Sequence, residues 1–194
     1  MPYTTRAKEK KPSPEILTCT METPLGKMLA AAVAEKAGTT NRNPPVAGLC
    51  GLWFIGQKYF PSNSASWITQ PGNPVFIKLR AWIDGYFSKQ KKLPPLPLSP
   101  QGTAFQQKVW KLLSDIPYGT VCTYGGIAEK LAKASGEKNA GQFTRAVAGA
   151  IGHNPISLVI PCHRVIGSDG TLKGYAGGIE RKQALLELEG TGLT

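Results

Sequence analysis

A cysteine and a histidine stand side by side at Cys162 and His163, separated by Pro161 from the apolar stretch of residues 156–160. Chemistry by a thiolate needs a cysteine with a lowered pKa and a nearby proton acceptor, and these two side chains could supply both. On a strand, neighbouring side chains point to opposite faces, so a water or a turn would have to connect the two groups. The alternative is a buried structural cysteine, since free cysteines are often part of a hydrophobic core.

A glutamate stands at the end of the last helix that we expect, where Glu189 is followed by Gly190. The C-terminal end of a helix favours cations, so a carboxylate there is an exception, and such exceptions are expected at functional sites. A Glu189 carboxylate that accepts a proton from His163 would explain the placement. A solvated surface glutamate is the alternative.

The second half of the chain is predicted to be mostly helical. Thr103 can cap a helix that ends at a turn near residues 116–119, and Thr123 can cap a short helix that runs through Leu131. A polar loop at residues 134–139 precedes a third helix at about residues 141–152, which Asn154 closes. Two short helices joined by a turn resemble a helix-turn-helix; ordinary helix packing is the alternative.

The third predicted helix has two unlike faces. Successive helical residues turn by about 100°, which groups the apolar side chains on a core face: Phe143, Val147, Ala150 and Ile151. The opposite face carries Arg145 among small residues: Gly141, Ala148, Gly149 and Gly152. Because each helical glycine costs about 1 kcal/mol relative to alanine, this bare face could make room for something bulky. DNA in a groove and a closely packed second helix are the two candidates.

The first half of the chain is predicted to combine strands with one helix. Residues 25–33 and 49–55 are interpreted as strands joined by a long polar loop at residues 35–45, and residues 62–72 as a further loop. Asn73 can cap a helix with Pro74 at its first position, and an apolar stripe extends this helix to near Ser88.

Prolines divide the sequence into two parts. Residues 91–100 contain four prolines, which a helix interior or a central strand would not accept. We therefore predict a disordered tail at residues 1–14, an N-terminal α/β domain at 15–90, a linker at 91–100 and a C-terminal domain at 101–194. The predicted fold class is two-domain α+β, with a small sheet-and-helix domain and a mainly helical domain that contains a helix-turn-helix.

The composition is that of a basic globular protein. The 194 residues are 41% hydrophobic and carry a formal net charge of +11, with a pI of about 9.6. Residues 1–99 hold 13 Lys/Arg and 5 Asp/Glu, whereas residues 100–194 hold 10 and 7. This balance suits an anionic partner such as DNA, RNA or a membrane surface. The half with Cys162 is the less basic one, so we interpret the excess charge as a general attraction.

The cysteines indicate a reducing compartment. The four cysteines are Cys19, Cys50, Cys122 and Cys162. They are widely spaced, and no two of them form a CxxC pair. With only two histidines, the spacing typical of zinc sites is absent, and we predict no metal and no cofactor. No apolar run approaches the roughly 20 residues of a membrane span, and the Lys-rich start lacks the apolar segment of a secretory signal. We predict an intracellular protein of the cytoplasm, or of the nucleus in a eukaryote.

Several motifs occur in an order that resembles a known family. They are Ile116-Pro117-Tyr118-Gly119-Thr120 with Tyr124, Arg145-Ala146-Val147, Asn154-Pro155, Ile160-Pro161-Cys162-His163-Arg164-Val165, Tyr175-Ala176-Gly177-Gly178 and Glu189-Gly190. Together they resemble the O6-alkylguanine-DNA alkyltransferase family, the direct-reversal DNA repair proteins, over about residues 103–190. The first half matches less distinctly, through residues 23–26 and 52–54.

The resemblance implies a reaction and roles for four residues. An alkyl group, such as methyl, would pass irreversibly from O6-alkylguanine in double-stranded DNA to the Cys162 thiolate, so that each monomeric protein acts once. His163 would act as base through a water, Glu189 would orient and charge it, and Asn154 would hold the local turn. Whether O4-alkylthymine is also a substrate stays open.

The resemblance also implies how DNA is held. The third helix would be the recognition helix in the minor groove, with Thr144, Ala146 and Ala148 near the DNA backbone and Arg145 in place of the flipped base. Tyr124 would assist rotation of the nucleotide and donate to the leaving base. The base pocket would be lined by Tyr124, by the backbone of Val165 and by the loop with Tyr175 and Ala176.

Some positions depart from the family pattern. Ala176 stands where several members carry serine, which would leave a backbone N–H as the donor there. The loop at residues 133–141 is longer than in some members, which puts the approach of Arg145 in doubt. The first half also lacks the Cys/His set that binds zinc in some members.

Two other functions compete with alkyl transfer. A Cys-His hydrolase usually takes its histidine from far away in the sequence, whereas His163 is adjacent to Cys162. A non-enzymatic helix-turn-helix DNA-binding protein would explain the charge and the third helix, but it gives no reason for the Pro161-Cys162-His163 run.

Overall fold

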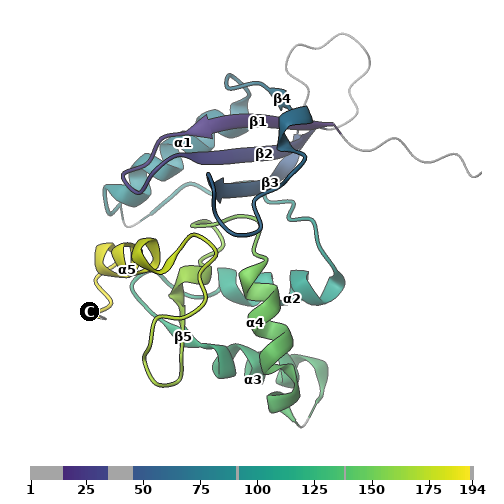
Figure 1. Cartoon of the computed structure of the whole chain (residues 1–194), viewed down its shortest axis with the longest axis vertical. Coiled ribbons are helices and arrows are strands. Elements are labelled where there is room, and N and C mark those ends of the chain that lie inside the picture. The colour runs from purple at the N-terminus through teal and green to yellow at the C-terminus, as the bar shows by residue number, and fades with distance from the viewer. Residues whose placement is uncertain (1–14, 35–45, 91, 138, 193–194) are drawn as a thin grey trace, which may run out of the picture.

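The computed structural model describes residues 15–34, 46–90, 92–137 and 139–192. A sheet with one helix forms the upper part of the molecule, and the remaining helices form the lower part (Figure 1). The predicted α+β fold class is confirmed. The predicted tail at residues 1–14 and the predicted loop at residues 35–45 lie outside the described residues.

The upper part contains a four-stranded sheet in the order β3-β2-β1-β4, formed by β1 (Ile16–Met21), β2 (Met28–Ala34), β3 (Val46–Phe54) and β4 (Ile68–Thr69). β2 pairs antiparallel with both β1 and β3, and β4 pairs parallel with β1. The two predicted strands correspond to β2 and β3 with shifted ends. β1 is absent from the prediction, although its buried Leu17, Cys19 and Met21 alternate along the strand.

One helix, α1 (Pro74–Phe87), packs on this sheet (Figure 1). The Asn73 side chain accepts a hydrogen bond from the Val75 backbone N–H at 3.1 Å, so the predicted cap and start are confirmed. Phe76, Leu79 and Ile83 are buried on one face. The region predicted as a loop at residues 62–72 also holds the short 3-10 helix η1 (Ser64–Ser66) and β4.

The proline-rich segment is bound to the sheet. The Leu49 N–H donates to the Pro97 carbonyl at 2.8 Å, and the Ser99 N–H donates to the Leu49 carbonyl at 2.7 Å. Backbone groups that β3 would otherwise expose at the sheet edge are thereby paired. The segment that we predict as a linker therefore also covers part of this edge.

The lower part is built from α2 (Ala104–Ser114), α3 (Tyr124–Ser135), α4 (Thr144–Gly152) and α5 (Ile179–Leu188), with a short parallel pair of β5 (Cys122–Thr123) and β6 (Val165–Ile166). Thr103 and Thr123 cap α2 and α3 as predicted. The third predicted helix begins later than expected, because residues 140–143 form a separate 3-10 turn, η2 (Ala140–Phe143).

The two parts share one continuous core. Buried apolar side chains from the sheet, α1, α2, α3 and α4 belong to a single cluster. Backbone bonds also cross between the parts, because the Leu52 N–H donates to the Pro155 carbonyl at 2.8 Å and the Ser157 N–H donates to the Leu52 carbonyl at 2.9 Å. β3 therefore directly supports the segment that leads to Cys162.

Across the described ranges, no helix is both long enough and apolar enough to cross a bilayer.

Candidate active site

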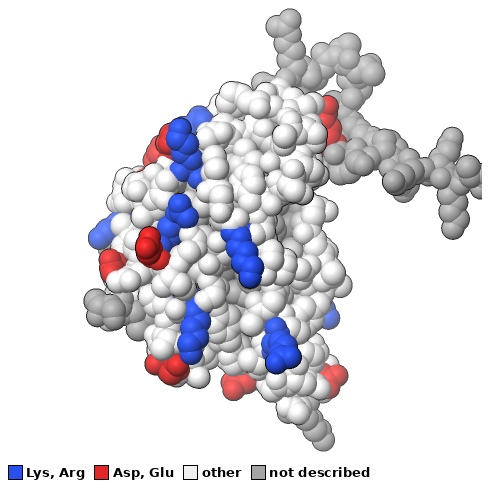
Figure 2. All heavy atoms as spheres, in the orientation of Figure 1, with Lys and Arg blue, Asp and Glu red and all other residues white. Residues whose placement is uncertain are grey.

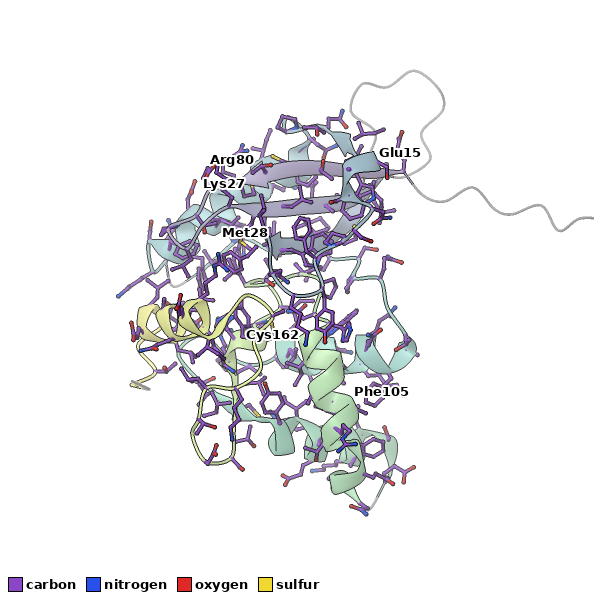
Figure 3. All side chains as sticks on the ribbon, in the orientation of Figure 1. Glu15, Lys27, Met28, Arg80, Phe105 and Cys162 are labelled. Atoms are coloured by element: carbon purple, nitrogen blue, oxygen red, sulfur yellow. The ribbon has the colours of Figure 1, made fainter. Side chains whose placement is uncertain are left out.

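Cys162 lies where the sheet meets the helices (Figure 3). It begins the 3-10 turn η3 (Cys162–Arg164) and is 5% exposed. The preceding residues 156–160 do not form a strand: they turn, and Leu158 has a positive φ of 69°. The strand geometry considered in the sequence argument therefore does not apply, because this segment pairs with β3 only at Leu52 and then turns.

Asn154 holds this turn and contacts the sulfur. Its amide nitrogen donates to the Ile160 carbonyl at 2.7 Å and to Cys162 Sγ at 3.0 Å, and its amide oxygen accepts from the Ile156 N–H at 3.0 Å. Burial raises the pKa of the Cys162 thiol, while the Asn154 hydrogen bond and the positive charge of Lys182 act to lower it. The resting cysteine is thus a thiol that needs a base.

Lys182 supplies the buried positive charge beside this site. Its Nζ donates to the carbonyls of Val165 and Lys173, and the side chain is fully buried. Burial lowers the pKa of Lys182 to about 8, although the Cys162 thiolate would favour the charged form. The two groups therefore stabilise each other when Cys162 is ionised.

His163 faces Glu189 through one ring nitrogen and leaves the other free of protein partners. The distance from His163 Nε2 to Glu189 Oε1 is 2.8 Å, and both side chains are fully buried. Nε2 carries the proton when it donates to the carboxylate, so Nδ1 is the basic nitrogen. Nδ1 is buried without a hydrogen-bond partner in the part of the chain that is described. Burial lowers the pKa of His163, with Glu189 partly opposing this, so the imidazole is neutral and can accept a proton.

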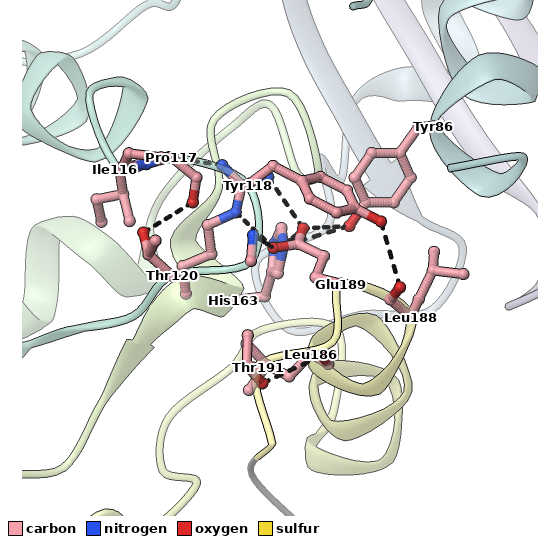
Figure 4. A network of polar contacts seen from close by, with 12 residues as sticks. Tyr86, Ile116, Pro117, Tyr118, Thr120, His163, Leu186, Leu188, Glu189 and Thr191 are labelled. Atoms are coloured by element: carbon pink, nitrogen blue, oxygen red, sulfur yellow. Dashed lines mark hydrogen bonds and ion pairs between the residues drawn. The ribbon is translucent and has the colours of Figure 1, made fainter. Parts of the chain in front are cut away.

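Glu189 is the centre of a dense network of donors (Figure 4). Arg164 donates to Oε2 through Nε at 2.8 Å and to Oε1 through Nη2 at 2.9 Å, and the Gly119 N–H donates to Oε2 at 3.1 Å. Burial alone would raise the pKa of Glu189, but the bonds from His163, Arg164 and Tyr86 lower it to about 2. The surface-glutamate alternative is therefore wrong.

The predicted pocket residues lie around Cys162 and His163. Tyr124 is half-buried, and its hydroxyl donates to the Lys173 carbonyl at 2.9 Å. Val165 follows directly in β6 and is buried, while the Tyr175 ring meets the His163 ring edge-on at 6.4 Å between centroids. The Ala176 carbonyl accepts from the Lys58 N–H at 3.1 Å, so the upper part of the molecule also holds the pocket loop.

The outer face of α4 is open, as the sequence pattern predicts. Val147, Ala150 and Ile151 are buried on the inner face. Arg145, Ala146 and Ala148 are exposed, as is Gly149, and Thr144 is half-buried. A Cβ built at Gly149 would meet no described atom within 4 Å outside the backbone of its own helix. A closely packed second helix is therefore not the reason for this bare face.

Basic side chains are distributed over the visible surface. Figure 2 shows Lys and Arg side chains spread singly across this face, over both parts of the molecule, with the acidic side chains mostly near its margins. This distribution fits the expectation of a general attraction for an anionic partner.

Three residues of the site have no role in the sequence argument: Lys182, Arg164 and Tyr86. Lys182 did leave a signal, because it shares the buried face of α5 with Leu185 and Leu186 at helical spacing. Tyr86 belongs to the apolar stripe of α1 and was indistinguishable there from a core residue.

Comparisons with known proteins agree with this geometry. Residues 104–191 match the family described as 6-O-methylguanine DNA methyltransferase, DNA binding domain. The chain is 43% identical to the methylated-DNA–protein-cysteine methyltransferase of Haemophilus influenzae over 137 residues, which is 70% of this chain and 72% of that protein. It is 40% identical to the protein of the same name from Methanosarcina barkeri over 169 residues, covering 87% and 94%.

A solved structure extends the similarity to the whole fold. The crystal structure of Mycobacterium tuberculosis OGT in complex with DNA superposes with a TM-score of 0.71 at 38% identity, covering 90% of this chain and 93% of that one. The order of motifs, the geometry around Cys162 and these likenesses agree with one another. The chain therefore belongs to the methylated-DNA–protein-cysteine methyltransferase family.

Proposed function

We propose that this protein repairs DNA by moving an alkyl group, such as methyl, from O6-alkylguanine in a duplex to Cys162. One observation carries this proposal: the buried sulfur of Cys162 accepts a hydrogen bond from Asn154 and lies next in sequence to a neutral His163. His163 is itself hydrogen-bonded to Glu189. A soft sulfur nucleophile suits displacement at an alkyl carbon, and the adjacent imidazole suits removal of the thiol proton.

In the proposed reaction one bond forms as one breaks. The thiol proton passes to His163 Nδ1 through a water, and the resulting Cys162 thiolate attacks the alkyl carbon. An S–C bond forms, the C–O6 bond breaks, and its electron pair leaves with guanine. Tyr124 then gives a proton to the departing base, and the proton that His163 took from the thiol returns through solvent to Tyr124, so that both side chains end neutral. Since the thioether has no ready route back to a thiol, each molecule acts once.

The proposed DNA contacts lie on α4 and on the loops beside it. A base inside a duplex cannot reach a buried sulfur, so the damaged nucleotide has to rotate out, at a cost of a few kcal/mol. Arg145 would fill the space left in the stack, while Thr144, Ala146 and Ala148 let the DNA backbone approach the helix. Val165, Tyr175 and Ala176 would receive the rotated base.

Further features follow from the same proposal. We place the acceptor cysteine and the DNA contacts in residues 101–194, and residues 15–90 form an N-terminal domain that connects to them through residues 91–100 and packs on them through the shared core. We also propose that the protein acts as a monomer, because one copy contains every group that the proposed chemistry uses, and that it acts inside the cell, where its free cysteines would stay reduced.

Replacement of the acceptor tests the function. We expect Cys162→Ala to abolish alkyl transfer from an O6-methylguanine duplex and to keep DNA binding, since the sulfur is buried and the proposed DNA contacts lie on α4. Cys50→Ala is the matched control, because Cys50 is a buried β3 cysteine with a pKa raised to about 11 by burial. Transfer rates and fluorescence anisotropy with labelled duplex measure the two properties. Loss of both properties together in Cys162→Ala would contradict the assigned roles.

Replacement of Arg145 tests the DNA half of the proposal. Arg145→Ala should slow transfer from a duplex about tenfold or more, because the rotated base loses its substitute in the stack. Transfer from a single-stranded oligonucleotide, which needs no such substitute, should change little. Wild-type rates on the duplex would rule out this role.

A further inference from the structure

Tyr86 reaches from the upper part of the molecule into the reaction site. It lies in the last turn of α1 and is 1% exposed, and its hydroxyl points at the carboxylate that anchors His163 (Figure 4). Within the described residues it is the one side chain of the upper part that bonds to the His163–Glu189 pair. Removal of the Tyr86 hydroxyl can therefore test whether residues 15–90 take part in the reaction.

The hydroxyl shares one carboxylate oxygen with the histidine. Tyr86 donates to Glu189 Oε1 at 2.6 Å, and His163 Nε2 lies 2.8 Å from the same oxygen. The direct separation between the Tyr86 hydroxyl and His163 Nε2 is longer, at 3.4 Å. The short bond to the carboxylate therefore dominates the effect of Tyr86 on the imidazole.

Aromatic neighbours hold this hydroxyl in place. The Tyr86 ring stacks on Trp82 with centroids 5.4 Å apart, and it meets Phe87 and Tyr118 edge-on at 5.3 and 5.9 Å. A ring fixed on several sides loses little freedom when its hydroxyl forms a bond, so the donor is preorganised. Burial, followed by the charge of Glu189, raises the pKa of Tyr86, so the hydroxyl keeps its proton.

A neutral donor at this oxygen changes how strongly Glu189 acts on His163. The charged groups near the imidazole are Glu189, which favours its protonation, and Arg164 and Lys182, which oppose it. The neutral Tyr86 and Tyr175 rings also face it, and Cys162 precedes it in η3. By drawing charge on Oε1 toward itself, the Tyr86 hydroxyl weakens the pull of the carboxylate on the imidazole proton. The histidine then stays neutral and keeps its basic Nδ1.

We propose that Tyr86 is a positioning residue for the transfer reaction: its hydroxyl fixes Glu189 and keeps His163 neutral, so the N-terminal domain supplies part of the reaction site. The inference rests on the proposed function. It acts through Glu189 and assigns Tyr86 no contact with DNA or the alkyl group.

The variant Tyr86→Phe tests this role, because it removes the hydroxyl and keeps the ring. Glu189 Oε1 retains its bonds from His163 and Arg164, so the fold should persist. Tyr118→Phe is the matched control: Tyr118 packs against the Tyr86 ring, but its hydroxyl donates to the Leu188 carbonyl at 3.2 Å. Single-turnover transfer would be followed across pH for the wild type and both variants.

The expected signature is a changed pH profile. In Tyr86→Phe the imidazole holds its proton to higher pH, so transfer should slow about three- to tenfold near pH 6 and less than about twofold near pH 8.5. Tyr118→Phe should follow the wild type. In a Glu189→Gln background, Tyr86→Phe should leave the pH dependence unaltered, because the shared oxygen has lost its charge. A wild-type profile, or an equal loss at every pH, would overturn the proposal.

A second measurement follows the protonation of the His163 imidazole directly, without the transfer reaction. The chain has two histidines, so nitrogen NMR of histidine-labelled protein can follow His163, with His153→Gln assigning the other signal. The His163 titration should move to higher pH in Tyr86→Phe and stay in place in Tyr118→Phe. An unmoved titration would refute the role of Tyr86 alone, whereas a wild-type protein that transfers no alkyl group would refute the proposed function.

Discussion

The surroundings of Cys162 act in opposite directions on the pKa of its thiol. Burial raises the pKa of Cys162, and a buried thiol is normally inert. The Asn154 amide at 3.0 Å and the charge of Lys182 favour the thiolate, and in the proposed reaction the neutral imidazole of His163 takes the thiol proton. In the proposed reaction Cys162 would become reactive only when its proton is removed, which suits a protein that can use its cysteine only once.

Asn154 offers a test at the scale of one residue. Asn154→Asp keeps an oxygen acceptor for the Ile156 N–H but replaces the donor to Cys162 Sγ with a negative charge. The pKa of Cys162 should therefore rise, and transfer near neutral pH should fall about tenfold or more. The pH dependence of Cys162 alkylation by iodoacetamide measures the thiol directly. Asn154→Ala, which adds no charge, is the comparison, and a larger thiol shift in Asn154→Ala would contradict this account.

Only part of the site could be predicted from single residues. Cys162, His163 and Glu189 stand in local patterns that carry their chemistry. The importance of Lys182 and Tyr86 depends on contacts formed by folding, since a lysine or tyrosine on an apolar helix stripe has an ordinary packing explanation. Arg164 lies inside the predicted motif, yet its bonds to Glu189 depend on a partner 25 residues away.

At the scale of elements, local signals predicted best. Asn73, Thr103 and Thr123 cap helices where the sequence places them, because a cap acts within three residues of itself. The strand geometry considered for Cys162 and His163 is wrong, because the apolar composition of residues 156–160 reflects burial against β3 and the segment turns. An apolar run of this length cannot by itself distinguish these structures.

A substitution on the open face of α4 should raise the stability of the fold and lower its affinity for DNA. Gly149→Gln should stabilise the fold by about 0.5–1 kcal/mol, because glutamine favours a helix more than glycine does and an added Cβ meets no described atom within 4 Å outside the backbone of its own helix. The same side chain should weaken DNA binding by obstructing close approach of the helix. Urea unfolding and duplex-binding titrations measure the two effects. Ile77→Gln, at an exposed position of α1, controls for adding a surface glutamine. Unchanged DNA affinity in Gly149→Gln would contradict the assigned binding face.

At the scale of the whole molecule, one network links the two parts to each other. Tyr86 from α1 and Arg164 and His163 from η3 all bond to Glu189 at the end of α5. The backbone hydrogen bonds between Leu52 and residues 155–157 also connect the two parts. The general two-part architecture could be predicted from the prolines and element order, but this joint core could not, because it requires knowledge of which faces meet.

The network should make the fold sensitive to acid. The pKa of Glu189 is lowered from 4.5 to about 2, so its stabilising effect is complete above about pH 4.5 and disappears as pH falls toward 2. A shift of this size corresponds to about 3 kcal/mol of unfolding free energy. The lowered pKa of His163 acts in the same direction, because unfolding lets the imidazole take up a proton as pH falls.

Urea unfolding at several pH values checks this expectation. Wild-type stability should fall steeply below about pH 4.5. Glu189→Gln should be less stable at neutral pH, because Arg164 loses its counter-charge, and its further loss on acidification should be smaller. Equal acid sensitivity in the two proteins would show that other groups control the transition.

The most direct measurement of the central claim is mass spectrometry of the protein after mixing with an O6-methylguanine duplex. The account predicts that the peptide holding Cys162 gains the mass of one CH2 group, because methyl replaces the thiol hydrogen, and that the gain saturates at one per protein. Peptides with Cys19, Cys50 and Cys122 should keep their masses. Unchanged mass at Cys162 with the duplex still bound would contradict the account and leave a lesion-binding protein without transfer activity.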